Sequence, residues 1–243
     1  MQQRNWIYEL EEYLEERYSI LPVHESIAGS NPALRIDPAL DSDEAKYFIL
    51  GLEAELFSID DEGYAQSSLL LKLSGSKGQQ KGFQLFWHFT NKGRKTRALF
   101  REGISQLASA SSLILKYGWD ISQVQIEARR EDFGALARGV DLVIKSAAGK
   151  ILICGEVKKD SREFEKLIED FRYCCQQGQH NKSDCKCRSN HPKYELCAFI
   201  KPAYFWAVSP GRELCYRLSY LDRKILLAEV ASLPHRSEID VLF

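Results

Sequence analysis

The sequence predicts an α/β protein in which a β-rich N-terminal region, residues 1–95, precedes a second domain, residues 96–243. Three observations carry this prediction. Of the 243 residues, 44% are hydrophobic, which is enough to bury a substantial core. Strand-like runs separated by turn-forming residues dominate the first region. From residue 96 onward, the predicted order is helix, three strands, helix and strand.

The N-terminal region begins with one predicted helix over residues 4–18, where apolar residues recur at helical spacing among glutamates. Residues 28–43 are rich in Pro, Ser, Asn and Asp and lack periodicity, which predicts a loop. Strands are expected at 46–59, 64–73 and 82–90. An antiparallel meander is the simplest arrangement for three such strands.

The second domain alternates helices and strands. Residues 98–116 follow helical spacing, and a second helix is expected to open at Asp160, with Glu163 positioned for a capping box. A closing hairpin is expected near the C-terminus, after a series of strands. The strand-like runs are 122–127, 140–145, 150–158 and 204–208, followed by 214–220 and 224–230.

The net charge of −1 conceals a strong segregation of charge along the chain. Residues 1–62 carry 15 acidic and 4 basic side chains, whereas residues 63–101 carry 8 basic side chains and no acidic ones. A local basic stretch is what a phosphate backbone requires, so nucleic acid is an expected partner of the N-terminal region and its border. A solvated surface is the alternative interpretation. The predicted contacts are Lys92, Arg94, Lys95, Arg97, Arg101, Arg129, Arg130 and Arg138.

Acidic residues stand where two neighbouring strands meet. Asp141 opens one strand, while Glu156 and Lys158 close the next and share a face because they are two residues apart. If residues 146–149 close a hairpin, the numbers of opposed residues sum to about 295–297, and the highest sum places Asp141 beside Glu156. Two such carboxylates would share Mg2+ or Mn2+, and the lysine would act on a water or a phosphate.

The alternative is that Glu-x-Lys occurs by chance on an exposed strand. Both faces of residues 150–157 are apolar, however, so Glu156 and Lys158 end a strand that is expected at the centre of a sheet. Charges at such a place are costly unless they are paired or bind a metal ion, which favours a functional site.

These residues resemble the motif of the PD-(D/E)XK, or restriction-endonuclease-like, nuclease superfamily. Asp141 and Glu156-Val157-Lys158 match it, Val140 stands where proline is common, and the resemblance covers about residues 96–230. It implies a restriction-endonuclease-like αβββαβ core with a mixed sheet. It also implies a nuclease that cleaves DNA with Mg2+ or Mn2+ held by Asp141 and Glu156, with Lys158 in the active site.

The family often adds an acidic residue from the first helix of this core. Glu102 is the only acidic residue on 98–116, so the resemblance assigns it to the site. A surface glutamate that interacts favourably with the helix macrodipole is the alternative interpretation.

Six candidate zinc ligands fall within 18 residues, between the second helix and the next strand: Cys174, Cys175, His180, Cys185, Cys187 and His191. The spacing is unusual, because one pair of cysteines is adjacent and another is separated by a single residue. Cys174 and Cys175 continue the apolar stripe of the helix, so packing is an alternative for them. The other four candidates lie in a polar loop, where apolar packing does not explain the presence of thiols. This predicts a structural Zn2+ within residues 174–191.

The expected setting is the cytoplasm, with no membrane partner. Seven cysteines is an odd number, no apolar signal core opens the chain, and no apolar run reaches the roughly 18 residues of a membrane span. The expected function is metal-dependent hydrolysis of phosphodiester bonds, and double-strand cleavage would favour a homodimer. The rival interpretation is a non-catalytic nucleic-acid-binding or interaction protein that keeps the fold, with a zinc-stabilised loop.

Overall fold

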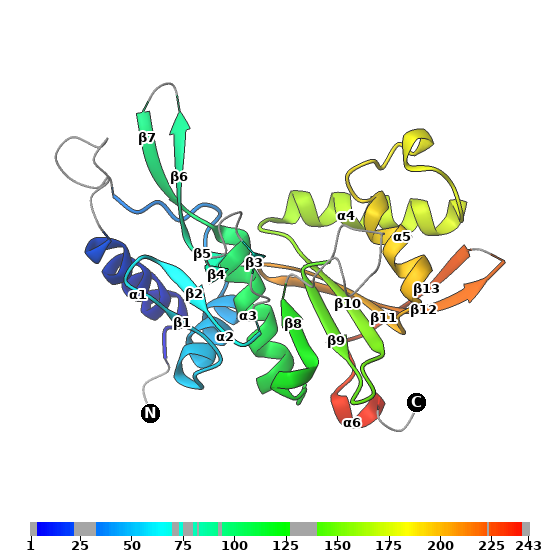
Figure 1. The fold of residues 1–243 in the computed structure, drawn as a ribbon, viewed down its shortest axis with the longest axis horizontal. Coiled ribbons are helices and arrows are strands. Elements are labelled where there is room, and N and C mark those ends of the chain that lie inside the picture. The colour runs from blue at the N-terminus through cyan, green and yellow to red at the C-terminus, as the bar shows by residue number, and fades with distance from the viewer. Residues whose placement is uncertain are drawn as a thin grey trace.

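The structure is a computed structural model that describes residues 4–21, 33–69, 73–74, 80–81, 83–91, 94–126, 140–222 and 224–239. The N-terminal helices and a two-stranded hairpin lie on one side of the molecule, and a large sheet with its covering helices lies on the other (Figure 1). No helix in these ranges is both long and apolar enough to cross a membrane.

Two helices open the chain. Helix α1 (Trp6–Ile20) confirms the helix predicted at 4–18, and the Asn5 side chain caps its first turn. Helix α2 (Ser42–Glu53) begins with a capping box between Asp41 and Glu44. The strand predicted at 46–59 is therefore wrong over most of its length, because apolar residues bury one face of α2 at helical spacing.

Short antiparallel strands follow, in three separate groups. The strands β1 (Ser58–Ile59), β2 (Tyr64–Gln66) and β5 (Phe83–Gln84) form a small sheet in that order. The strand β3 (Leu73–Ser74) pairs with β4 (Gln80–Lys81), and β6 (Phe86–Asn91) pairs with β7 (Arg94–Leu99). Strand β7 was not predicted, because its basic residues break the apolar alternation. The domain boundary predicted near residue 95 falls inside the β6–β7 hairpin.

A six-stranded mixed sheet forms the larger part of the fold, in the order β13-β12-β11-β10-β9-β8. The pair β10–β11 is parallel and the other pairs in this sheet are antiparallel. This confirms the α/β class, the mixed sheet and the closing hairpin. The strands are β8 (Val124–Ile126), β9 (Leu142–Lys145), β10 (Ile151–Val157), β11 (Tyr204–Ser209), β12 (Arg212–Leu221) and β13 (Lys224–Val230).

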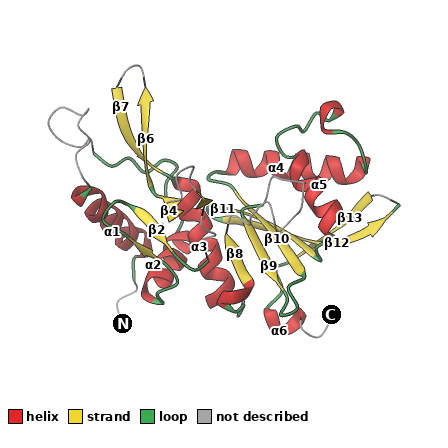
Figure 2. Cartoon of the chain, in the orientation of Figure 1, coloured by secondary structure: helices red, strands yellow, loops and turns green. Residues whose placement is uncertain are grey.

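Helices cover both faces of this sheet (Figure 2). Helix α3 (Arg101–Leu115) packs on β8 and β10, while α4 (Ser161–Gln177) packs on β11 and β13 and against α5 (His191–Ile200). The first two of these helices were predicted, and Asp160 caps α4. Helix α5 was not predicted. A short helix, α6 (Arg236–Ile239), lies near the C-terminus.

Strand β10 lies between two hydrophobic clusters and is buried along its whole length. Leu152 and Ile153 belong to the cluster that also contains residues of α1, α2 and α3, whereas Ile151 and Cys154 belong to the cluster with residues of α4 and α5. The first cluster thus joins residues on both sides of position 95. The expectation that Glu156 ends a central strand is confirmed.

Candidate active site and cysteine cluster

The β9–β10 hairpin places Asp141 beside Glu156. Gly155 pairs with Leu142, and Cys154 pairs with Val143. This register, continued by one residue, sets Asp141 opposite Glu156, which is the closest of the arrangements compatible with the sequence. The backbone N–H of Val157 also donates a hydrogen bond to Asp141 Oδ2 at 2.8 Å. Asp141 is therefore fixed at the end of β10 where Glu156 lies.

Lys158 links this hairpin to helix α3. Its Nζ atom lies 2.8 Å from Glu156 Oε1 and 3.4 Å from Glu102 Oε1. Glu102 belongs to the first turn of α3, and the backbone N–H of Lys158 donates to the Val208 carbonyl oxygen of β11 at 2.8 Å. The four residues predicted for the active site, Glu102, Asp141, Glu156 and Lys158, therefore meet at one end of the central strands.

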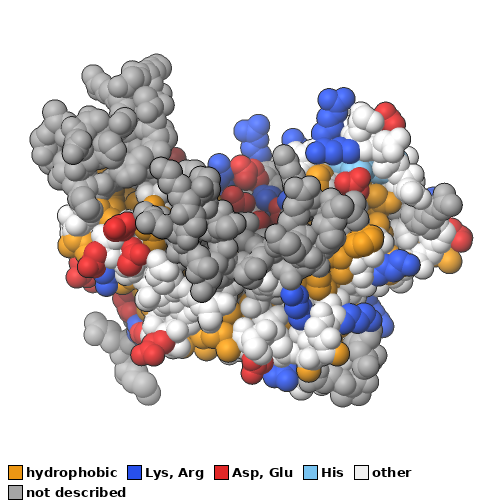
Figure 3. All heavy atoms as spheres, in the orientation of Figure 1, with side chains coloured by type: hydrophobic (Ala, Val, Ile, Leu, Met, Phe, Trp, Pro, Cys, Tyr) orange, Lys and Arg blue, Asp and Glu red, His pale blue; other side chains and the backbone are white. Residues whose placement is uncertain are grey.

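A second lysine at this place was missed. Lys193 in the first turn of α5 puts its Nζ atom 3.1 Å from Glu156 Oε1, and its side chain is only 16% exposed. Nothing in the local sequence connects Lys193 with the acidic motif, since only the packing of α5 brings it there. Helix α5 could have been recognised from one local signal, Pro192, because proline is favoured at the start of helices. Acidic and basic side chains meet near the middle of the face drawn in Figure 3.

Burial and crowding determine the electrostatics of the site. Burial raises the pKa of Asp141 well above its usual range, and the Glu156 carboxylate raises it further. For Lys158, burial acts to lower the pKa, but the nearby carboxylates of Glu156 and Asp141 outweigh it, so the pKa of Lys158 lies above its ordinary value. These carboxylates therefore favour the charged form of Lys158.

The two carboxylate oxygens of Glu156 have different surroundings. Oε1 contacts both lysines, whereas Oε2 is buried and has no hydrogen-bond partner among the residues that the structure describes. A buried polar atom without a partner costs roughly 1–3 kcal/mol, and more where it carries charge. Oε2 is thus a position at which a ligand of positive charge would be stabilising.

The position of Arg101 contradicts its predicted role in nucleic-acid binding. Its guanidinium pairs with the Glu44 carboxylate at 2.7 and 2.9 Å and donates to the Pro38 and Ala39 carbonyl oxygens. The side chains of Arg101 and Glu44 are only 1% and 5% exposed. Arg101 lies between α2 and α3 and cannot reach a phosphate backbone, so its assignment to nucleic-acid binding is wrong.

The other predicted cations are described only in part. Arg94, Lys95 and Arg97 lie on strand β7, not in the loop expected from their charge. Their role in nucleic-acid binding stays a prediction. The remaining predicted contacts lie outside the described residues: Lys92, Arg129, Arg130 and Arg138.

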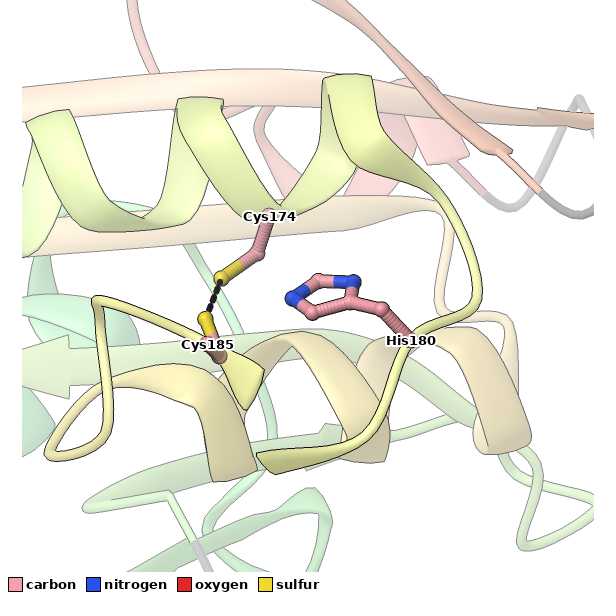
Figure 4. Close-up of side chains that lie close together, drawn as sticks. All are labelled: Cys174, His180 and Cys185. Atoms are coloured by element: carbon pink, nitrogen blue, oxygen red, sulfur yellow. Dashed lines mark hydrogen bonds between the residues drawn. The ribbon is translucent and has the colours of Figure 1, made fainter. Parts of the chain in front are cut away.

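Three of the six predicted metal ligands lie together. Cys174 in the last turns of α4 meets His180 and Cys185, which follow in the connection to α5, and one ligand atom of each lies within 4.8 Å of the others (Figure 4). The Sγ atoms of Cys174 and Cys185 are 3.5 Å apart. This buried group could hold a metal ion.

The other three candidates differ from one another. Cys187 is buried beside the group, and its backbone N–H donates to Cys185 Sγ at 3.3 Å. Cys175 is not in the group, and burial in the core raises the pKa of its thiol, which fits the packing alternative. His191 is also outside the group, because its Nε2 atom contacts the His180 carbonyl oxygen at 3.2 Å.

No family model, curated protein or solved structure matches this chain. Its function must be inferred from the residues of the site and their geometry.

Replacing Asp141 by asparagine is expected to raise the melting temperature at pH 7 in buffer with EDTA, and this gain should shrink as the pH falls towards 4. The folded-state pKa of Asp141 lies above the unfolded value of about 3.9, so raising the pH between the two values ionises the unfolded chain first and destabilises the wild type. Asparagine does not titrate and keeps an acceptor for the Val157 N–H. Thermal unfolding between pH 4 and 8 measures the effect.

Each kcal/mol recovered by this variant should appear as about 2–4 °C in melting temperature. The control is Asp120→Asn, because hydrogen bonds from Ser122 lower the pKa of Asp120 and its replacement should give no gain. Equal pH dependence of the wild type and Asp141→Asn would contradict the prediction. Adding Mg2+ should stabilise the wild type more than Asp141→Asn.

Proposed function

We propose that this protein is a divalent-metal-dependent nuclease of the restriction-endonuclease-like kind and that its substrate is DNA. The observation that carries the proposal is the meeting of Glu102, Asp141, Glu156 and Lys158 at the end of a buried central strand. The order of helices and strands from α3 to β11, with a parallel pair beside the hairpin, is consistent with the core that the PD-(D/E)XK resemblance implies.

The side chains of the site fit Mg2+ or Mn2+. Glu156 Oε2 is buried without a partner among the described residues, Asp141 lies opposite Glu156, and hard carboxylate oxygens are the ligands these ions prefer. Burial and the neighbouring Glu156 carboxylate raise the pKa of Asp141, and a divalent cation bound by both carboxylates would offset these two effects. A bound Mg2+ would polarise a phosphoryl oxygen and lower the pKa of a bound water.

The two lysines supply fixed positive charge. Lys158 and Lys193 are largely buried and both contact Glu156 Oε1, so their ammonium groups are held in place before a substrate arrives. A charged lysine so placed can bind a phosphate oxygen and stabilise the negative charge that develops during hydrolysis.

The deciding experiment incubates the purified chain with labelled single-stranded, duplex and branched DNA and RNA, in Mg2+, Mn2+ or EDTA. Cleavage of DNA that requires the metal is the expected result. Binding without cleavage in any metal would contradict it and favour the rival function. A homodimer, measured by light scattering, would supply the two sites that double-strand cleavage needs.

One observation favours that rival, a non-catalytic protein that binds nucleic acid. Two lysines on Glu156 offset most of the negative charge of the site without any metal ion. A site that has lost catalysis could persist as such an ion-pair network. The cleavage assay separates the two functions, because the rival protein would bind nucleic acid without cleaving it in either Mg2+ or Mn2+.

Neutralising the basic run is expected to weaken DNA binding and reduce its salt dependence. The variant replaces Lys92, Arg94, Lys95 and Arg97 by glutamine. Each lost phosphate contact should remove about 0.9 from the slope of log affinity against log salt concentration on duplex DNA. Fluorescence anisotropy over a range of NaCl concentrations measures that slope.

The control neutralises three exposed cations of the α4–α5 connection: Lys182, Lys186 and Arg188. Its slope should equal that of the wild type. If the slope changes in the control and not in the first variant, the contact surface lies on the cysteine-rich connection and the prediction fails.

A further inference from the structure

The connection between α4 and α5 has almost no apolar side chains to hold it in place. Residues 178–190 are polar apart from a glycine and two cysteines, yet Cys185 and Cys187 are only 3% and 2% exposed. A segment of this composition buries too little apolar surface to offset the entropy lost on ordering it. Some other interaction must fix it against α4.

The imidazole of His180 is oriented as a metal ligand. Its Nδ1 atom lies 2.6 Å from the Gly178 carbonyl oxygen. Since a carbonyl oxygen only accepts, Nδ1 carries the proton and the lone pair is on Nε2. That atom is buried without a hydrogen-bond partner within the described ranges, and the ring points toward the sulfur atoms of Cys174 and Cys185 (Figure 4). Ligand histidines are commonly fixed in this way by their second nitrogen.

The two thiols complete a donor set suited to zinc. The Sγ atoms of Cys174 and Cys185 are 3.5 Å apart, well beyond the roughly 2.05 Å of a disulfide, and each lies within 4.8 Å of the His180 ligand atom. Two sulfurs and one imidazole nitrogen that converge on one point are typical of Zn2+ and unsuited to Mg2+.

Cys187 is the best-placed fourth ligand. It follows Cys185 by two residues and is buried. Its backbone N–H already donates to Cys185 Sγ. Structural zinc sites are closed by four protein ligands in a tetrahedron, and the thiol of Cys187 would supply the fourth beside Cys174, His180 and Cys185.

We propose that Cys174, His180, Cys185 and Cys187 bind one Zn2+, which fastens the α4–α5 connection to the end of α4. Binding replaces the thiol protons by the metal ion, and no oxidant or reductant takes part. This site is separate from the acidic site and stands whether or not the chain is a nuclease, because its metal content is measured without a substrate.

Elemental analysis of the full chain, purified without chelator, should find about one zinc per chain. Cys174→Ser and Cys185→Ser should each retain less than about a tenth of that zinc. Cys175→Ser is the matched control: Cys175 is the adjacent buried cysteine in α4 but is not in the group, so this variant should keep its zinc. Wild-type protein without zinc, or undiminished zinc in Cys174→Ser, overturns the proposal.

A second measurement uses the wild type alone and so does not depend on the variants folding. Titration with an organomercurial should release zinc to a coloured chelator as the thiols react, and hydrogen exchange in residues 178–190 should then rise. A Cys174–Cys185 disulfide in zinc-free native protein would overturn the site.

Cobalt tests the fourth ligand. Co2+ added to the zinc-free chain should give the charge-transfer absorption of thiolate ligands, and Cys187→Ser should reduce its intensity. Undiminished absorption in Cys187→Ser would remove Cys187 from the site.

Discussion

Glu156→Gln is expected to slow Mg2+-dependent DNA cleavage by about 10³-fold, which corresponds to about 4 kcal/mol of transition-state stabilisation. The substitution keeps the volume of the side chain and removes the charge on Oε2, the buried oxygen without a partner among the described residues. It also leaves Lys158 and Lys193 with one fewer anion. Single-turnover cleavage with saturating protein measures the chemical step.

Binding of DNA by this variant should not weaken, because a negative charge has been removed next to the expected position of the phosphate. The matched control is Glu169→Gln, which neutralises an exposed glutamate on α4 and should cleave at the wild-type rate. Circular dichroism checks that both variants are folded. Cleavage by Glu156→Gln within about tenfold of the wild type would show that the acidic site does not perform the reaction.

Arg101→Met is expected to destabilise the protein by about 3–5 kcal/mol, because it leaves the Glu44 carboxylate buried without its cation. The pair is almost wholly buried between α2 and α3, and Glu44 also accepts a hydrogen bond from the Ser105 hydroxyl. At about 2–4 °C per kcal/mol, the melting temperature should fall by about 6–20 °C. Urea and thermal denaturation measure the loss.

Two comparisons make this result specific. Adding Glu44→Gln to Arg101→Met should recover part of the loss, since the uncompensated charge is removed and an acceptor remains for the α2 cap. Glu165→Ala breaks an ion pair with Arg212 that is about half exposed, and should cost at most about 1 kcal/mol. Similar losses for Arg101→Met and Glu165→Ala would mean that the buried pair carries no special stability.

Most helices and strands after residue 100 were predicted from the sequence, because their apolar patterns are regular and turn-forming or capping residues mark their ends. Strand β10 was recognised from an apolar run, and α4 from its stripe and its cap at Asp160. Helix α2 was mistaken for a strand because its apolar residues form a dense run, while Asp41, which forms the capping box with Glu44, lay in the segment 28–43 assigned to a loop. A dense apolar run is compatible with the periodicity of a buried helix and with that of a buried strand.

The candidate site was predictable where it is local and not where it depends on packing. Asp141 and Glu156 meet through a short hairpin, which the sequence shows, but a register shift between Ile151 and Ile153 brings them opposite each other, and the sequence does not show that shift. Lys193 reaches the site only because α5 packs beside α4. Arg101 and Glu102 are adjacent in the sequence, yet one is buried against α2 and the other faces Lys158. The number of charged residues in a segment does not show which face of a helix each of them occupies.

The parallel pairing of β10 and β11 bears on how the chain reaches its native state. Partners such as Ile153 and Tyr204 are about 50 residues apart, whereas the β9–β10 hairpin joins near neighbours in sequence. Closing the longer loop costs more entropy, so we expect the crossover to form after the hairpin. In that order, the hairpin would bring the carboxylates of Asp141 and Glu156 together first, and Lys193 would join them later, when α5 packs in the crossover.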